Sequence, residues 1–404
     1  MAEAVMVPGR LPLAGNAFQA MRDPLSFLMS LPAPGDVVEV RIGPRLVYVL
    51  CSAELTRQAL LDDRTFDKGG LLLDKVREIL GNGLATCPHS VHRRQRRLVQ
   101  PAFHRSRMPG YADMMAQEIS GVVSLWTEGQ TLGIVDEMQK ISSHRLARAM
   151  FAEAALAPEE LSSLAADFTI FQEGVMRRAF ISDWMNRLPT RGNISYNRAM
   201  TRLRRSVNSL ITEYRSDERG RTDLLSVLMA AHDSGSSHDG TDLRLSDTEL
   251  AEQCLTFLFG GMETTANALA WAIHLVARHP DIEEQLHAET DEILTDAPAT
   301  YDDLPRLELT GRIIAETLRL YPPGWALTRT TTGETQLGNT PSPQTPPFVY
   351  SAYLLHRSPD FYPNPERFDP DRWKPGDKKP PNYPKARSSP SRAGPANALE
   401  TLSR

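Results

Sequence analysis

Between Val91 and Pro280, apolar residues recur almost without a break at the spacing of α-helices, and this run limits the chain to a mainly helical fold. The longest helix is predicted to begin at a capping box formed by Ser246 and Glu249 and to end at His279, because Pro280 cannot continue it. A chain of 404 residues, 41% of them hydrophobic, can bury a large core around such helices. Further helices are predicted over residues 53–61, 108–126, 135–151, 158–180, 195–218, 222–232 and 307–320.

Short stretches of β pattern lie near both ends of the chain. Residues 37–42 and 46–50 flank Gly43-Pro44 and are typical of a β-hairpin. Short strands are also expected around residues 325–329 and 348–353. The predicted fold class is therefore mainly α with a small β-rich lobe.

Charge and composition exclude several classes of partner. The net charge of -5 and pI near 6.1 give no reason to expect nucleic acid or a membrane surface as a partner. No apolar run approaches the roughly 20 residues that span a bilayer, and residues 1–16 lack the basic and apolar regions of a secretion signal. Cys51, Cys87 and Cys254 are too scattered for a disulfide framework or a zinc site. A cytoplasmic monomer is expected.

A glutamate and two arginines are candidates for a buried ion triad. Glu316 and Arg319 stand three residues apart and share one face of their helix. Arg367, within a Pro-Glu-Arg-Phe motif, is predicted to complete the triad. Alone, the first pair would be more simply an exposed surface pair, worth a few tenths of a kcal/mol. The Tyr-Pro-Pro that ends the helix and the motifs that follow favour the buried triad.

Two adjacent glycines, Gly260 and Gly261, lie inside the longest predicted helix. Each lowers helix stability by about 1 kcal/mol relative to alanine. Because glycine carries no side chain, the pair is predicted to leave room for a small ligand beside the helix. Glu263 and Thr264 follow at once, and an acid next to an alcohol can relay protons through water to bound dioxygen. The alternative is a kinked helix with a solvent-facing Glu263 and a Thr264 hydroxyl bonded to its own backbone.

A dense basic cluster, residues 92–97, begins the helical run. His92 and Arg96 are four residues apart, point the same way and could hold two carboxylates. Arg329 is a further candidate for a carboxylate group. The other arginines could attract an acidic protein partner, or the cluster could be a solvated face or a nucleic-acid patch.

These motifs together resemble the cytochrome P450 family, from residue 6 to about residue 385. A narrower likeness to soluble bacterial members that oxidise terpenes rests on Phe66-Asp67-Lys68-Gly69, residues 81–86 and residues 92–104. The resemblance implies the P450 fold and a haem-thiolate monooxygenase. Such an enzyme hydroxylates an apolar small molecule, here expected to be a terpenoid, with dioxygen and two electrons.

The resemblance also implies roles for the candidate residues. Haem b would lie beside the paired glycines, with its propionates held by His92, Arg96 and Arg329. Glu263 and Thr264 would be the oxygen-activating acid–alcohol pair, and the ion triad would be structural.

Substrate and redox partner are likewise implied by the resemblance. The substrate would lie under residues 62–90, predicted as a long loop, and near the helices around Phe168, Phe171 and Met176. Leucines at 71–73 make that loop apolar, which suits a hydrocarbon-like ligand. Electrons would come from a ferredoxin, itself reduced by a ferredoxin reductase, docked on the basic helix.

The chain departs from the family pattern after the triad motifs. The family's next element is a Phe-x-x-Gly-x-Arg-x-Cys-x-Gly loop whose thiolate binds the iron, but no cysteine follows Cys254. The codons of residues 386–403, read two bases later, can spell Ala-Phe-Leu-Pro-Phe-Ala-Gly-Gly-Pro-Arg-Glu-Cys-Val-Gly-Asn-Thr-Leu. Residues 1–385 are therefore interpreted as a P450 domain truncated before the cysteine loop and last core helix, and residues 386–404 as a disordered, frameshifted tail.

Two readings follow for the chain as written. The first is a monooxygenase recorded in damaged form, with no axial metal ligand in this reading frame. The second is an inactive truncated product or a haem-free binding protein. In either case, loss of the last core helix would expose an apolar face of the longest helix.

Overall fold

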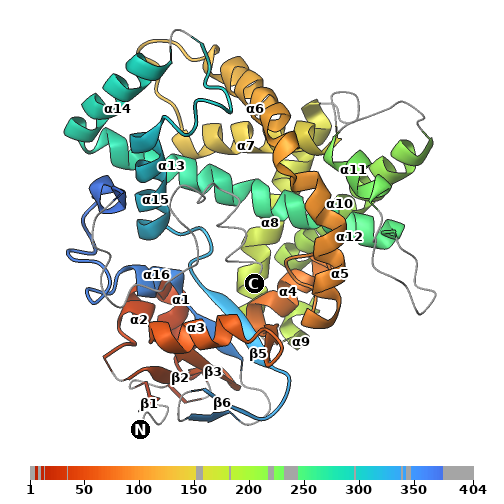
Figure 1. The fold of residues 1–404 in the computed structure, drawn as a ribbon. Helices are drawn as coiled ribbons and strands as arrows, with labels where there is room; N and C mark the ends of the chain where they lie inside the picture. The colour runs from red at the N-terminus through yellow and green to blue at the C-terminus, as the bar shows by residue number, and fades with distance from the viewer. Residues whose placement is uncertain are drawn as a thin grey trace.

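The structure, a computed structural model, describes residues 5–7, 11–12, 14–33, 35–151, 158–181, 183–216, 223–231, 244–294, 297–337, 340–342 and 347–375. Its main sheet lies at one end of the molecule and most of its helices lie at the other (Figure 1). The predicted fold class, mainly α with a small β-rich lobe, is confirmed.

The main sheet contains strands from early and late parts of the chain. Its strand order is β1-β2-β3-β8-β5-β4, so the late strands β8 and β5 lie between the early strands β3 and β4. The predicted hairpin is β2 and β3, and its turn places Gly43 at a φ of 58°, which glycine adopts without strain. The two strands predicted near the end of the chain are β5 and β8. The strands are β1 (Val5–Met6), β2 (Val37–Ile42), β3 (Arg45–Leu50), β4 (Phe66–Lys68), β5 (Leu327–Thr331) and β8 (Phe348–Tyr350), with β6 (Thr335–Leu337) and β7 (Thr340–Ser342) forming a second small sheet.

The helices fall into two groups in Figure 1. The group beside the sheet consists of α1 (Ala17–Arg22), α2 (Pro24–Met29), α3 (Ala53–Leu61) and α16 (Ala352–His356). The remainder are α4 (Leu71–Leu80), α5 (His89–Val99), α6 (Met108–Val123), α7 (Ile134–Phe151), α8 (Pro158–Phe180), α9 (Asp183–Asn186), α10 (Arg191–Ser216), α11 (Leu224–Ala230), α12 (Asp247–Gly261), α13 (Glu263–Ala277), α14 (Pro280–Ile293) and α15 (Glu308–Leu320), with 3₁₀ turns η1 (Gln100–Phe103), η2 (Arg105–Arg107) and η3 (Pro370–Trp373).

The longest predicted helix is divided into α12 and α13 at Met262. Its predicted start is confirmed, because Ser246 and Glu249 form the capping box. The division directly follows the glycine pair, and glycine has a lower helix propensity than every other residue except proline. The prediction of one continuous helix is therefore wrong at this point.

Two other segments differ from the predictions. Residues 62–90, predicted as a long loop, contain β4 and α4. The strand is too short to show a period of its own, and it forms because β5 pairs with it. Beyond the predicted end of α13, Pro280 starts α14, because its missing N–H is not needed in the first turn of a helix.

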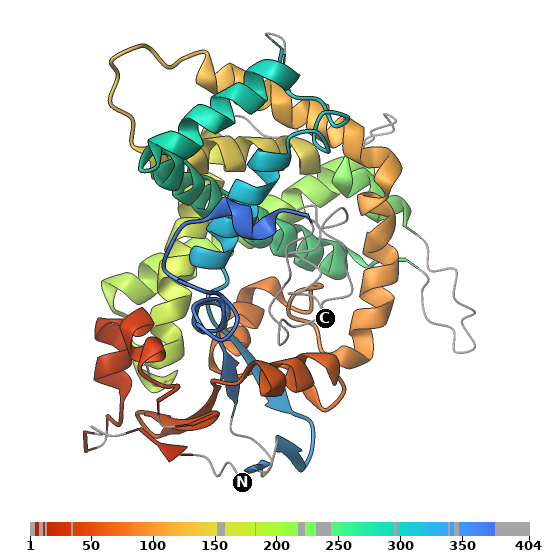
Figure 2. The same ribbon diagram turned by 60° about the vertical axis from the view of Figure 1, so that its left-hand side comes forward.

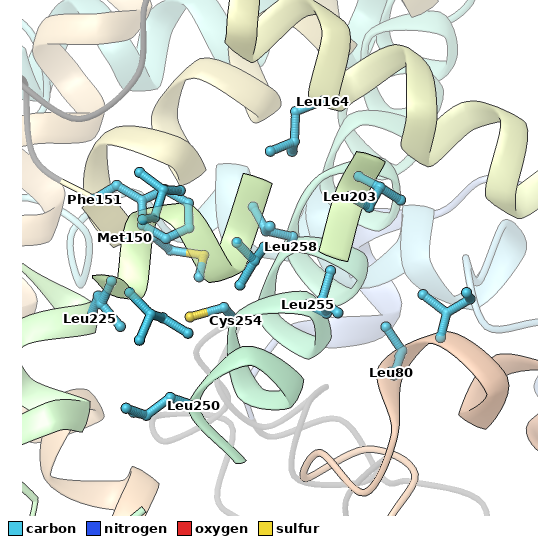
Figure 3. Close-up of a cluster of buried hydrophobic side chains, with 14 of the residues drawn as sticks. Leu80, Met150, Phe151, Leu164, Leu203, Leu225, Leu250, Cys254, Leu255 and Leu258 are labelled. Atoms are coloured by element: carbon cyan, nitrogen blue, oxygen red, sulfur yellow. The ribbon is translucent and has the colours of Figure 1, made fainter. Parts of the chain in front are cut away.

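The largest buried apolar cluster packs α12 against helices of the helical lobe. Figure 3 shows Cys254 of α12 among Met150, Leu225, Leu250 and Leu258. All five side chains are fully buried, so this part of α12 is a packed core element. No helix in the described ranges has the length and apolar character needed to cross a membrane.

Glu316 joins α15 to the last described segment, which lies across α15 in Figure 2. Its carboxylate accepts two hydrogen bonds from Arg319, at 2.8 and 2.9 Å, and one from the Trp373 indole at 3.0 Å. Arg319 also donates to the carbonyls of His356 and Pro365. Glu316 and Arg319 are 0% and 1% exposed, so the predicted buried pair is present.

The second arginine on Glu316 is Arg372 and not Arg367. The Arg372 Nε lies 3.2 Å from the Glu316 carboxylate, whereas Arg367 is exposed and only its backbone carbonyl accepts from Arg319. The sequence contains Pro-Glu-Arg-Phe and Pro-Asp-Arg-Trp five residues apart. The second of these lies in η3, which packs on α15, so its arginine reaches the carboxylate.

The two arginines form a matched pair for mutation. We expect Arg372→Ala to lower the free energy of unfolding by about 3 kcal/mol, because it removes one partner of a buried carboxylate. Arg367→Ala should change it by less than about 0.5 kcal/mol, as for most surface substitutions. Urea unfolding followed by circular dichroism measures both, and equal losses would show that Arg372 has no special role.

Candidate functional site

The glycine pair borders open space on one side and a helix on the other. A Cβ added to Gly260 would meet no atom within 4 Å, although this residue is only partly exposed. A Cβ added to Gly261 would lie 2.8 Å from Leu146 Cδ2 of α7. The two glycines therefore differ: Gly261 permits close packing of α7, and Gly260 leaves open space beside the helix.

The side chain of Thr264 is hydrogen-bonded to the backbone of its own helix, at Gly260. Its hydroxyl donates a hydrogen bond to the Gly260 carbonyl across the break at Met262. This is the backbone bond of the alternative interpretation, and it is present. The donated proton leaves the hydroxyl oxygen's lone pairs available to accept a bond from a ligand or water.

Glu263 is half-buried, in contrast to the solvent-facing residue of the alternative interpretation. Burial raises the pKa of its carboxyl above the usual value; the hydrogen bond to Asn267 opposes this, and the nearby charge of Glu173 adds to it. A carboxyl with a raised pKa takes up and releases protons closer to neutral pH. Glu263 thus has the properties of a proton-transfer group next to Thr264.

The predicted carboxylate-binding residues meet around a lysine that the sequence analysis did not single out. Arg329 of β5 lies directly opposite Lys68 of β4, and both side chains are buried. Lys68 also acts electrostatically on His92 of α5, as does Arg96. The structure therefore brings His92, Arg96 and Arg329 to one partly buried, positively charged region.

The side chain of His92 is incompletely hydrogen-bonded. Its Nε2 is buried and has no hydrogen-bond partner in the described part of the chain. Burial is the main cause that lowers the pKa of His92 to about 4, and the charges of Lys68 and Arg96 add to the effect. A buried polar atom without a partner destabilises the fold, so an anionic group in this region would stabilise it.

The remaining arginines of α5 differ in their availability. Arg94 forms an ion pair with Glu249 of α12 and also donates to the Arg244 carbonyl at 2.8 Å. Arg93 and Arg97 are exposed. Arg94 thus joins α5 to α12, whereas Arg93 and Arg97 lie at the surface.

The three cysteines do not provide a thiolate. Burial raises the pKa of Cys51 and Cys254 to about 12, and it raises the pKa of Cys87 as well. A metal-binding thiolate needs the opposite, a lowered pKa. The described residues therefore include cations that suit the carboxylates of a haem, but no thiolate donor for its iron.

The predicted substrate-contacting aromatics are core residues. Phe168 and Phe171 are 2% and 0% exposed, and Phe171 packs against Phe259, the residue before Gly260, with ring centroids 5.6 Å apart. Residues 71–73 are partly buried in the first turn of α4. The side chain of Met176 lies outside the described residues.

Comparison with known proteins identifies the family. The cytochrome P450 family model matches residues 6–391, and the chain belongs to that family. It is 42% identical over 369 residues to pentalenene oxygenase of Streptomyces avermitilis, covering 91% of this chain and 80% of the relative. It is 43% identical over 372 residues to cyclooctatin synthase of Streptomyces melanosporofaciens, covering 92% and 80%.

A third relative is cyclooctat-9-en-7-ol 5-monooxygenase of the same organism, 42% identical over 367 residues, which cover 91% of this chain and 78% of the relative. The predicted family and its likeness to terpene-oxidising members are thus confirmed. The cofactor of this family is haem b, as predicted.

The two glycines yield opposite predictions for stability without cofactor. Gly260→Ala should stabilise the chain by up to about 1 kcal/mol through helix propensity, since its Cβ meets no atom within 4 Å. Gly261→Ala should destabilise it by about 1–3 kcal/mol through overpacking against Leu146. Denaturant unfolding of cofactor-free protein measures both, and the reverse order would contradict the assigned environments.

Proposed function

We propose that this protein is a monooxygenase that hydroxylates a terpenoid or a similar apolar molecule. The reaction inserts one oxygen atom into a C–H bond and reduces the other to water with two electrons and two protons. The observation that carries the proposal is the 42–43% identity to terpene-oxidising relatives across 91–92% of the chain. Haem b, when bound, supplies the activation of dioxygen.

The chain's own residues have separable roles in this proposal. His92, Arg96 and Arg329 hold the cofactor's carboxylates, for which their partly buried positive region is suited. Gly260 leaves space for the small ligand. The Thr264 hydroxyl accepts a hydrogen bond there, and Glu263 exchanges protons with water beside it.

Electron supply is proposed to come from a ferredoxin with its reductase. Arg93 and Arg97 on α5 are exposed and can attract an acidic protein surface. Such steering weakens as salt screens the charges. A cytoplasmic location and a monomeric state are part of the same proposal.

The iron ligand requires a further step in the proposal. No cysteine follows Cys254 in the 404 residues, and residues 376–404 lie outside the described ranges. We propose that the codons of residues 386–403, read two bases later, encode the cysteine loop of the active enzyme. The second candidate, an inactive product or haem-free binding protein, is favoured by the raised pKa values of the cysteines.

Resequencing the gene from the Trp373 codon onward, then expressing both reading frames, separates these candidates. We expect the restored frame to give the thiolate-haem absorption band on reduction with carbon monoxide, and to hydroxylate terpene hydrocarbons. The 404-residue chain should not give this band, because it lacks the donor. If the band is absent from both chains, the second candidate is correct.

Substitution of the acid–alcohol pair tests the proton-transfer roles in the restored-frame protein. Thr264→Val and Glu263→Gln should each lower hydroxylated product per electron consumed by about 10²-fold, a typical effect of losing a proton-transfer group. Substrate affinity should stay within about threefold, because neither change removes apolar contact area.

Thr264→Ser is the matched control, since it keeps the hydroxyl that donates to the Gly260 carbonyl. Product and electron consumption are measured together, and substrate binding is measured by calorimetry. If Thr264→Val left the hydroxylated product per electron consumed unchanged, the only role of the hydroxyl would be its hydrogen bond to the backbone.

A further inference from the structure

The segment between α8 and α10 has an inverted distribution of polar and apolar side chains. Asn186 and Asn193 are only 5% and 6% exposed, whereas Trp184 is 65% exposed. Further exposed apolar side chains of this segment are those of Met185, Leu188 and Ile194. Asparagine is mostly exposed in folded proteins, and exposed apolar side chains that gather in one place mark an interaction site. We call Trp184, Met185 and Leu188 the apolar tip.

The two buried asparagines hold the segment in this conformation. The Asn186 side-chain amide donates to the Arg178 carbonyl at 3.0 Å. The Asn193 side-chain amide donates to the Met185 and Leu188 carbonyls, at 3.0 and 2.8 Å. Turning the apolar side chains inward would take these carbonyls from their donors, and an unpaired buried polar group destabilises the fold. The apolar tip therefore points outward because the asparagines occupy the inside.

Ion pairs at the start of α9 fix the position of the segment. Asp183 pairs with Lys75 of α4 at 2.9 Å and with Arg45 of β3 at 3.3 Å. Arg45 also donates to the Ala179 carbonyl at 3.2 Å. A helix and a strand outside the segment thus hold it, so the apolar tip is a fixed part of the surface.

The helix that follows, α10, carries an arginine stripe, defined as Arg191, Arg198 and Arg205. These residues are seven positions apart, so they lie along one face of the helix, and the buried residues of α10 lie on the other. All three are exposed, and none forms an ion pair within the described part of the chain. The stripe begins three residues after Leu188, so it continues directly from the apolar tip.

The stretch from residue 184 to residue 212 has charges of one sign only. It contains six arginines and no aspartate or glutamate, in a chain whose net charge is -5. Two of the six have acceptors on other helices: Arg202 pairs with Asp167, and Arg204 donates to the Glu78 carbonyl. The net charge of the whole chain gives no reason to expect a membrane surface as a partner, but a surface contact responds to the local charge.

We propose that the apolar tip and the arginine stripe bind the surface of an anionic lipid bilayer. The tip enters the headgroup region, and the stripe contacts lipid phosphates. Tryptophan and leucine beside a basic helix face are typical of elements that lie in a membrane interface. The inference goes beyond the proposed function and does not depend on it, since none of these residues belongs to the candidate site.

Two other occupants fit the same face less well. An acidic protein surface would pair with the arginines, but it would not account for the outward-facing Trp184. A second copy of this chain, related by a twofold axis, would use the same patch on both copies. Such a contact would bring two arginine stripes together, and like charges repel.

The test measures by sedimentation how the full 404-residue chain binds lipid vesicles. Vesicles of phosphatidylcholine alone are compared with mixtures that contain anionic phosphatidylglycerol, and polyglutamate serves as a model of an acidic protein surface. One variant is Trp184→Ser, and the stripe variant replaces all three stripe arginines by glutamine. The substituted side chains are exposed, so both variants should fold, which circular dichroism checks.

Each variant has a matched control. Leu125→Ser removes an apolar side chain that is 75% exposed and lies after α6. A control triple variant changes the net charge as much as the stripe variant does, by replacing exposed arginines elsewhere on the molecule: Arg64→Gln, Arg278→Gln and Arg367→Gln.

We expect the parent chain to bind the mixed vesicles and to bind phosphatidylcholine vesicles far more weakly. The stripe variant should bind the mixed vesicles about a hundredfold more weakly, because three cations near an anionic surface are lost. Trp184→Ser should bind them about tenfold more weakly through loss of buried apolar area. Both controls should match the parent within about twofold. High salt should bring the parent towards the stripe variant, because it screens the charges.

Several results would overturn the inference. A parent chain that does not bind the mixed vesicles, or a control triple variant that loses as much affinity as the stripe variant, would remove the role of this face. Full binding by Trp184→Ser would show that the tip does not enter the lipid. Stripe-dependent binding to polyglutamate but not to vesicles would assign the face to an acidic protein. A dimer that Trp184→Ser abolishes, without vesicle binding, would assign it to a second copy.

Discussion

The buried carboxylate of Glu316 holds α15 against η3, the last described element of the chain. It accepts from Arg319 of the same helix and from Arg372 and Trp373 of η3, so moving α15 relative to η3 would break the last two hydrogen bonds to a buried carboxylate. The chain runs from α15 into β5, and β5 carries Arg329 to the positively charged region. The ion cluster thus lies in the helix that directly precedes the strand carrying Arg329.

The centre of the helical lobe combines two opposite requirements. Below the break, α12 is packed as tightly as any core helix, with Cys254 fully buried among leucines (Figure 3). At the break, Gly260 leaves open space beside the helix, and the half-buried Glu263 has a raised pKa. Local departures of this kind are typical of functional sites. They also explain why the helix is divided there.

The sequence predicted what local patterns determine and missed what long-range contacts determine. The hairpin, the capping box and the buried Glu316–Arg319 pair all follow from short-range spacing, and they are present. The short strand β4 has no period of its own and forms only because β5 pairs with it. For the same reason Arg372 was missed: two similar motifs could reach Glu316, and only packing on α15 selects one.

The same limit explains why Lys68 was overlooked, and it shows how the site is built. In the sequence Lys68 stands 261 positions before Arg329 and next to an acid, so an ordinary surface ion pair is the natural reading. Strand pairing instead places it opposite Arg329, while Asp67 turns to the backbone of α5. The pairing of β4 with β5 thus places two buried cations opposite each other, which the local pattern of neither strand indicates. Buried like charges repel each other more strongly than exposed ones, so placing Lys68 and Arg329 side by side costs free energy that the packing of the rest of the fold offsets.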